Sequence, residues 1–257
     1  MTSQFFTILS AGLGAGIVTG FVGASAVVIV APVLITFLGY EPYTAIGISL
    51  ATDIVASAVS AYTFQRHDNL ELREGLYLAL ASVTAAVIGS WISHYISATI
   101  LGGSTGIVIL LMGISFLRKP LDQRLQDFQD KFDLSFWQER KKLSALVFGG
   151  GIGLMTGFFG AGGGMMILMV LTFIYGFSVH TAVGTSVLIM TFNALLGAGS
   201  HFFVAQHIPY SEVLISGLGG LIGAILAANY ANLISEKRLS KVIGGVFIIL
   251  GLVSVIQ

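Results

Sequence analysis

The sequence has 257 residues, of which 55% are hydrophobic and 9% are charged, and its 12 basic and 12 acidic residues leave no net charge. Soluble domains carry about 25% charged residues, so this composition excludes an ordinary soluble domain and predicts an integral membrane protein, with the lipid bilayer as partner and no nucleic acid. Cysteine is absent, which excludes disulfides and thiol chemistry.

Ten apolar segments follow one another along the chain, with boundaries that the pattern defines to within a few residues. In lipid each must be helical, because an unpaired backbone finds no water there, so the predicted fold class is all-α integral membrane. The first 20 residues contain no Lys or Arg, so we expect the first segment to remain in the mature protein. The segments are 5–21, 26–38, 43–64, 72–95, 101–117, 143–159, 165–175, 180–204, 210–230 and 239–256.

The chain repeats itself. Residues 19–24 (TGFVGA) recur at 156–161 (TGFFGA), 137 positions later, and matches continue to the pair Gly113 and Gly251 after one inserted residue. A register kept over a hundred residues indicates two homologous halves, a recurring feature of transporters. We therefore predict three parts, which are a first transmembrane repeat at 1–117, a connection at 118–141 and a second transmembrane repeat at 142–257.

Basic residues define the orientation. All Lys and Arg residues fall into the three groups 66–73, 118–142 and 237–241, whereas the loops near Glu41, Ala98 and Gln206 contain none. Because cytoplasmic loops carry an excess of Lys and Arg, the three groups are predicted to be cytoplasmic. The central loop would then be cytoplasmic and both termini extracytoplasmic, in the cell (inner) membrane.

The crossing count constrains residues 143–175. Between the central connection and Lys237 the number of crossings must be even, and segments 180–204 and 210–230 already supply two. The stretch is therefore a re-entrant hairpin or a pair of short spans that turn at glycine, and the sequence leaves both open. Each half then crosses an odd number of times. This predicts two inverted-topology repeats, each a broken or re-entrant helix pair followed by three transmembrane helices.

The central connection has the pattern of an amphipathic helix. Leu121, Leu125, Phe128 and Phe132 recur at helical spacing, with charged residues on the other faces. We expect this helix to lie on the cytoplasmic surface of the membrane and to join the two halves.

One acidic residue lies inside an apolar segment. Asp53 shares a helical face with Ser49, Ser57 and Ser60, and no span supplies a Lys or Arg to pair with it. Intramembrane acids are expensive and usually face a cavity with a function, so Asp53 is the candidate for proton coupling. The alternative is a protonated carboxyl that hydrogen-bonds to a neighbouring helix. A Na⁺ site built from backbone carbonyls and Asp53 is also left open.

Two breaks at equivalent places in the halves form the candidate substrate site. The glycine-rich run 160–164 precedes one short apolar segment, and Ser25 precedes its counterpart. The N-terminus of a half-helix carries partial positive charge, which makes a small oxyanion the expected ligand. Position 190, equivalent to Asp53, is a methionine. The substrate-binding candidates are Ser25, Ser49, Gly162, Gly163, Gly164, Thr185, Ser186 and Asn193.

These motifs resemble the TauE/SafE family of sulfite exporters, and the resemblance covers essentially the whole chain. The second half carries the family's element at 157–164 (GFFGAGGG), followed by 182–186 (AVGTS). The first half carries degenerate copies at 23–27 (GASAV) and 45–49 (AIGIS). The resemblance implies transport of sulfur-containing anions such as sulfite, sulfoacetate and related sulfonates.

We therefore expect a secondary transporter that exports such an anion by alternating access of two inverted halves. The alternatives are a passive anion channel, a transporter of carboxylates or other small anions, and a membrane scaffold. The chain contains no HExxH, GxSxG or GxGxxG motif, so we expect no enzyme, no metal site and no cofactor. GxxxG spacings such as Gly16/Gly20 and Gly149/Gly153 fit helix packing within one chain or in a homodimer.

Overall fold

The structure is a computed structural model that describes residues 2–93, 114, 135–159, 163–205 and 209–256. Several sequence predictions fall outside these residues. They are the span at 101–117 (residue 114 apart), the amphipathic pattern Leu121, Leu125, Phe128 and Phe132, and the loops at Ala98 and Gln206.

All regular structure in the described residues is helical. The order is α1 (Thr2–Val22), α2 (Val27–Leu38), α3 (Pro42–Arg66), α4 (Leu72–Ser93), α7 (Ser135–Glu139), α8 (Lys141–Ser144), the π-helical turn η1 (Ala145–Gly149), α9 (Gly150–Phe159), α10 (Gly163–Phe173), α11 (Val179–Ala205), α12 (Tyr210–Leu233) and α13 (Glu236–Ile256). The prediction of an all-α protein is confirmed for this part of the chain.

Four of these helices are long and apolar enough to cross a membrane, namely α1, α3, α11 and α12. The apolar helices α2 and α10 are shorter, with 12 and 11 residues. At about 1.5 Å per residue each extends less than 20 Å, so neither crosses a hydrocarbon core of about 30 Å. The two short segments that follow the predicted breaks are thus half-helices, and the architecture is that of a multi-pass membrane protein.

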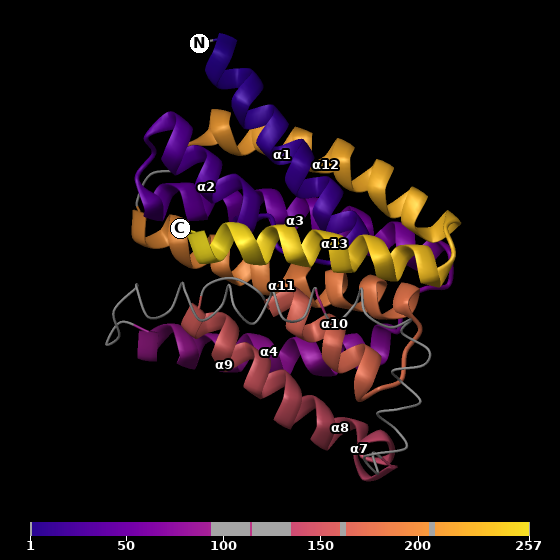
Figure 1. Ribbon diagram of the computed structural model, residues 1–257. Helices are drawn as coiled ribbons and strands as arrows, with labels where there is room; N and C mark the ends of the chain where they lie inside the picture. Colours follow the sequence, from indigo (N-terminus) through magenta and orange to yellow (C-terminus); the bar gives the residue numbers. More distant parts are fainter. Residues whose placement is uncertain (1, 94–113, 115–134, 160–162, 206–208, 257) are drawn as a thin grey trace.

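The helices pair across the two halves of the sequence. In Figure 1, α1 runs beside α12 at one edge of the molecule and α9 runs beside α4 at the opposite edge, with α3 and α11 between them. By the repeat, α1 corresponds to α9 and α4 to α12, so the two edges are the same pairing made twice.

Glycine brings the backbones together at both edges. A methyl group at Gly16 of α1 would overlap the carbonyl oxygen of Gly220 on α12. A methyl group at the equivalent Gly153 of α9 would overlap the carbonyl oxygen of Ser82 on α4. Small residues allow membrane helices to gain van der Waals contact by close approach. The GxxxG spacings thus serve packing within the chain at these two places.

In each of the helix pairs α1–α2 and α9–α10, the first helix starts and the second helix ends at the same end of the molecule. That end differs between the two pairs. At one end, here the Tyr40 end, Gln4 Nε2 donates to the Tyr40 hydroxyl at 2.9 Å, and that hydroxyl donates to Glu212 at 2.8 Å. This places the start of α1, the end of α2 and the start of α12 together. The chain therefore leaves the Tyr40 end through α1, reverses at Gly23 and comes back to the Tyr40 end through α2.

At the other end, here the Lys141 end, the Tyr175 hydroxyl donates to the Lys141 carbonyl oxygen at 3.2 Å. The chain thus leaves this end through α8, η1 and α9 and comes back to it through α10. Lys141 Nζ also lies 2.7 Å from Glu74 Oε1 at the start of α4. The basic groups at 66–73, 140–142 and 237–241 belong to this end, since α3 ends there and α4 and α13 begin there.

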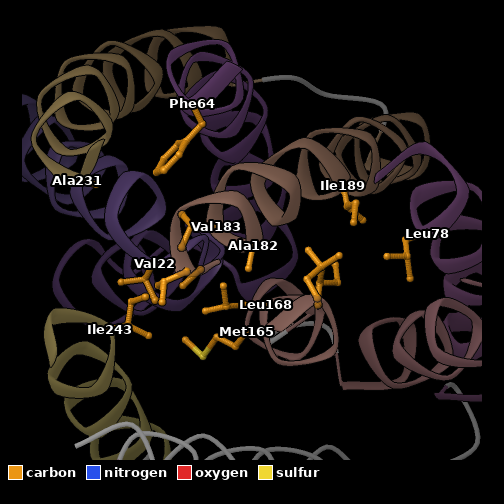
Figure 2. Packing of buried hydrophobic residues seen from close by; sticks show 14 of the residues in the cluster. Val22, Phe64, Leu78, Met165, Leu168, Ala182, Val183, Ile189, Ala231 and Ile243 are labelled. Atoms are coloured by element: carbon orange, nitrogen blue, oxygen red, sulfur yellow. The ribbon is translucent and has the colours of Figure 1, made fainter. Parts of the chain in front are cut away.

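The half-helix α10 lies in the middle of the core. Figure 2 shows Met165 and Leu168 of α10 among Val22, Val183 and Ile243, which come from three other helices. Leu168 is fully buried and Met165 is 1% exposed. Irregular backbone at membrane depth is tolerated where protein covers it. Enclosure by α1, α11 and α13 therefore explains how a broken helix pair is accommodated here.

Candidate functional site

The first break is a tight turn between α1 and α2. Gly23 adopts φ +65, and a methyl group at this position would overlap the Ser186 hydroxyl of α11. Thr19 supports the turn, because its hydroxyl donates to the Ala24 carbonyl oxygen at 2.8 Å. Glycine is required at residue 23 both for its left-handed conformation and for the close approach of α11.

The carboxylate of Asp53 occupies the start of α2. Asp53 is 2% exposed; its Oδ2 accepts a hydrogen bond from the Ser25 hydroxyl at 2.7 Å, and its Oδ1 accepts one from the Ala26 backbone N–H at 3.1 Å. The Ser25 hydroxyl also accepts a hydrogen bond from the Val27 N–H at 3.3 Å. The first N–H groups of a helix lack partners within the helix and carry partial positive charge. An acidic side chain from α3 thus satisfies the N-terminus of α2.

The second break lies against the first. A methyl group at Gly164, in the first turn of α10, would overlap both the Gly23 carbonyl oxygen and the Met190 sulfur of α11. A methyl group at Gly163 would overlap the Thr156 hydroxyl of α9. The starts of α2 and α10 therefore meet around Gly23, and glycine is required where they touch.

Hydroxyl groups connect α3 to α11 next to this meeting point. The Ser57 hydroxyl donates to the Asp53 carbonyl oxygen at 2.5 Å, and the Thr191 hydroxyl of α11 donates to Ser57 at 3.0 Å. The turn of α3 that carries Asp53 is thereby linked to the second half of the chain. Ser49, on the same face of α3, donates to the Ala45 carbonyl oxygen of its own helix at 2.6 Å.

The structure brings together five of the predicted site residues. Asp53 bonds to Ser25, while Gly163, Gly164 and Ser186 belong to the meeting point of the two breaks. Gly162 lies outside the described residues.

Two further predicted residues make their hydrogen bonds elsewhere. The Thr185 hydroxyl accepts the backbone N–H of Glu71 at 3.0 Å, beside the start of α4, and Asn193 accepts the Ser82 hydroxyl of α4 at 3.3 Å. Sequence reasoning missed the role of Gly23 and of Met190 in the contact, although the repeat register marks both. Gly23 matches Gly160, and Met190 matches Asp53.

A family model for the sulfite exporter TauE/SafE matches residues 8–254. The chain belongs to this family. The TauE/SafE match spans both helix pairs and both breaks, which the structure places at the centre of the molecule. The two copies of the Gly-Phe element end α1 and α9, the first helices of the two pairs.

Curated relatives support a transport role for the TauE/SafE chain. A "probable membrane transporter protein YunE" of Bacillus subtilis (strain 168) is 22% identical over 96% of both chains. A "probable membrane transporter protein YdhB" of the same organism is 26% identical over 89% of this chain and 91% of the relative. A "probable membrane transporter protein" of Xylella fastidiosa (strain 9a5c) is 28% identical over 94% of this chain and 91% of the relative. No solved structure gives a significant match. The chain is therefore a membrane transporter of the TauE/SafE family.

Proposed function

We propose that this transporter is a secondary exporter of a small sulfur-containing anion, such as sulfite, sulfoacetate or a related sulfonate, and that Asp53 couples transport to protons. The observation that carries the proposal is the carboxylate of Asp53 at the start of α2, bonded to Ser25 and to the Ala26 N–H. An anion that belongs to the protein itself already uses this helix start, which supports the view that these half-helix ends are built to bind anions.

The second half offers the same arrangement without the acid. The repeat equates Asp53 with Met190, Ser25 with Gly162 and Ala26 with Gly163. The first turn of α10 thus faces an uncharged and flexible thioether in place of a carboxylate. The start of α10 is therefore our proposed binding place for the anion, with Gly163, Gly164 and Ser186 around it and Met190 as the side chain that must move.

Anion binding at this site should depend on the protonation state of Asp53. An anion at the start of α10 would lie beside the buried carboxylate, and two negative charges repel strongly where water is scarce. A proton taken up by Asp53 would remove that repulsion. Anion binding and protonation of Asp53 would thus favour each other, so anion and proton would be carried in the same direction, and export would be driven by the outward gradient of the anion.

The two helix pairs supply the route for alternating access. They open at opposite ends of the molecule while their breaks meet at Gly23, which supports a description as two inverted repeats around one site. We place the basic Lys141 end in the cytoplasm and the Tyr40 end outside, following the positive-inside rule. Both termini are then extracytoplasmic, in the inner membrane.

A carboxylate is the second candidate substrate. The group observed at the start of α2 is a carboxylate, and its two oxygens accept hydrogen bonds from one hydroxyl and one backbone N–H. A free carboxylic acid of similar size would find the same kinds of donors at the start of α10. Sulfonate and carboxylate ligands therefore need to be compared directly.

A thermal-shift screen of the purified protein makes this comparison. The ligands are sulfite, sulfoacetate, taurine, acetate and malonate at two pH values. A ligand at 100 times its Kd should stabilise the protein by about 2.7 kcal/mol. The proposal expects sulfite or sulfoacetate to give the largest shift; a larger shift with acetate or malonate would instead assign carboxylates as substrates.

Flux into proteoliposomes tests transport itself. The proposal expects saturable flux and counterflow of the stabilising anion, lost in Gly163→Leu and changed in its proton dependence in Asp53→Asn. Flux that neither saturates nor shows counterflow would indicate a channel. Sulfonate flux unchanged in both variants would overturn the proposed site.

A further inference from the structure

A charged pocket lies at the Lys141 end, away from the meeting point of the two breaks. Its volume is about 480 Å³, and it lies between the first turns of α4 and the segment α7–α8. Its lining residues are Arg73, Glu74, Tyr77, Glu139, Arg140, Lys141, Lys142 and Leu143. Four cationic side chains thus face two carboxylates, so the pocket carries excess positive charge. We propose that it binds the phosphate head group of an anionic phospholipid.

The cations in the pocket are only partly neutralised. Glu74 pairs with Lys141 at 2.7 Å, and the Glu74 side chain is 10% exposed. Arg140 instead lies over the ring of Phe136, with its Cζ 4.7 Å from the ring centroid. Lys142 Nζ lies 5.9 Å from the ring centroid of Tyr77. An aromatic face orients a cation without cancelling its charge. Arg140 and Lys142 therefore remain available to an anion, with Arg73 on the facing side.

Exposed apolar side chains lie next to the pocket on two neighbouring elements. Leu143 lines the pocket and is 37% exposed, and the adjoining η1 exposes Leu146 and Val147. On α4, which packs against η1, Leu76 and Leu80 are also exposed and share one helix face. Charged groups at one end and exposed leucines beyond them match a lipid, in which a phosphate is joined to acyl chains. A soluble phosphate would use only the charged part.

Aromatic residues of the kind found at the level of lipid head groups belong to the elements beside the pocket. The ring centroids of Trp137 and Phe148 are 5.1 Å apart, and those of Phe136 and Trp137 are 5.3 Å apart. Trp and Tyr concentrate at the membrane–water interface, and basic pockets on the cytoplasmic side of membrane helices bind anionic head groups. The pocket therefore lies beside residues typical of that depth.

The bound lipid would also stabilise the half-helix α10. The Lys141 carbonyl oxygen accepts the Tyr175 hydroxyl at 3.2 Å, and Gln138 Nε2 donates to the Ile174 carbonyl oxygen at 3.4 Å. The segment α7–α8 thus touches both the pocket and the end of α10. A head group that holds α7–α8 against α4 would fix this end of the half-helix.

Lipid titrations of the delipidated protein test the proposal. Binding and thermal stability are measured with phosphatidylglycerol, with phosphatidylcholine, and with inorganic phosphate alone. The double variant Arg140→Gln/Lys142→Gln removes two pocket cations. Its matched control, Lys237→Gln/Lys241→Gln, removes two exposed cations outside the pocket lining at the same end. Melting temperatures in phosphatidylcholine establish that both variants are folded.

We expect phosphatidylglycerol to bind at least tenfold more tightly than phosphatidylcholine, and this preference to fall about tenfold in the pocket variant but not in the control. Leu80→Ser/Leu146→Ser should weaken phosphatidylglycerol binding while the cations stay in place. Three results would overturn the proposal. They are no preference for phosphatidylglycerol, an equal loss of that preference in the pocket variant and in the control variant, or full stabilisation of the protein by inorganic phosphate. None of these results depends on the identity of the transported anion.

Discussion

Ser25 and Asp53 are joined by a 2.7 Å hydrogen bond that links the first break to the middle of α3. Because Asp53 also accepts the Ala26 N–H, a single carboxylate holds together α2, the turn that precedes it and α3. In the proposed mechanism, protonation of Asp53 would therefore act directly on the start of the half-helix α2.

Replacement of Asp53 by Asn should separate charge from structure. An amide can still accept the Ala26 N–H and can donate to the Ser25 hydroxyl, so we expect the melting temperature to change little. The negative charge is lost, so anion flux in proteoliposomes should no longer respond to an imposed pH gradient. The wild-type protein under the same gradients is the control. A pH response retained by Asp53→Asn would exclude Asp53 as the coupling group.

Replacement of Ser25 by Ala should destabilise the protein. The change leaves one oxygen of a buried carboxylate without its donor and removes the acceptor of the Val27 N–H. Hydrogen bonds to charged groups contribute roughly 1.5–3 kcal/mol, so we expect a loss of about that size in the unfolding free energy. Ser10→Ala is the control, since Ser10 bonds only within its exposed turn of α1, to the Thr7 carbonyl oxygen. Equal effects of the two changes would contradict the assigned role of Ser25.

The glycine contacts between helices can be tested with matched pairs. Gly16→Ala should destabilise the protein by about 1–3 kcal/mol, because the methyl group meets the Gly220 carbonyl oxygen of α12. Gly14→Ala, two residues earlier in α1, meets only an Ile29 methyl at 3.9 Å and should be neutral or slightly stabilising. Thermal unfolding in detergent distinguishes the two.

The equivalent pair in α9 gives an independent check on the second edge. Gly153→Ala would meet the Ser82 carbonyl oxygen, whereas Gly151→Ala has open space around the added methyl. We expect the same difference as in α1. If Gly153→Ala proved as stable as Gly151→Ala, the close contact of α9 with α4 would be wrong.

The orientation of the protein in the membrane can be tested by cysteine labelling. The sequence contains no cysteine, so any introduced thiol is unique. Glu41 and Lys237 are both exposed and lie at the Tyr40 and Lys141 ends respectively. A membrane-impermeant thiol reagent added to whole cells should label Glu41→Cys. It should label Lys237→Cys only after the membrane is opened. The reverse pattern would invert the proposed topology.

Within the described residues the sequence predicted the helices well, because the dominant signal is apolar length. The start of α2 and the start of α10 were also located, since Ser25 and the glycine run interrupt otherwise apolar segments. In lipid few other arrangements satisfy the backbone, so pattern and structure agree closely. The occupant of the first break was harder to predict. Asp53 was expected near the ligand, but a sequence pattern does not show that its carboxylate reaches the Ala26 N–H.

The candidates on α11 show the limit of one-dimensional reasoning. Thr185 and Ser186 are neighbours in sequence, yet adjacent helical positions point in different directions. Ser186 lies against Gly23 at the break, whereas the Thr185 hydroxyl accepts the backbone N–H of Glu71 near the Lys141 end. Which face of α11 meets the break is decided by the packing of α4 and α3, and that packing is not encoded in the local pattern.

The pairing of α1 with α12 and of α9 with α4 bears on how the protein is made. In the described residues, the closest glycine contacts of the first helix of each half are made with a helix of the other half, Gly16 with α12 and Gly153 with α4. Either half synthesised alone would expose that strip of backbone to lipid, without the contacts that hold it at the edge of the molecule. We therefore expect that the two halves do not fold independently, and that α1 reaches its final place only after α12 has been inserted.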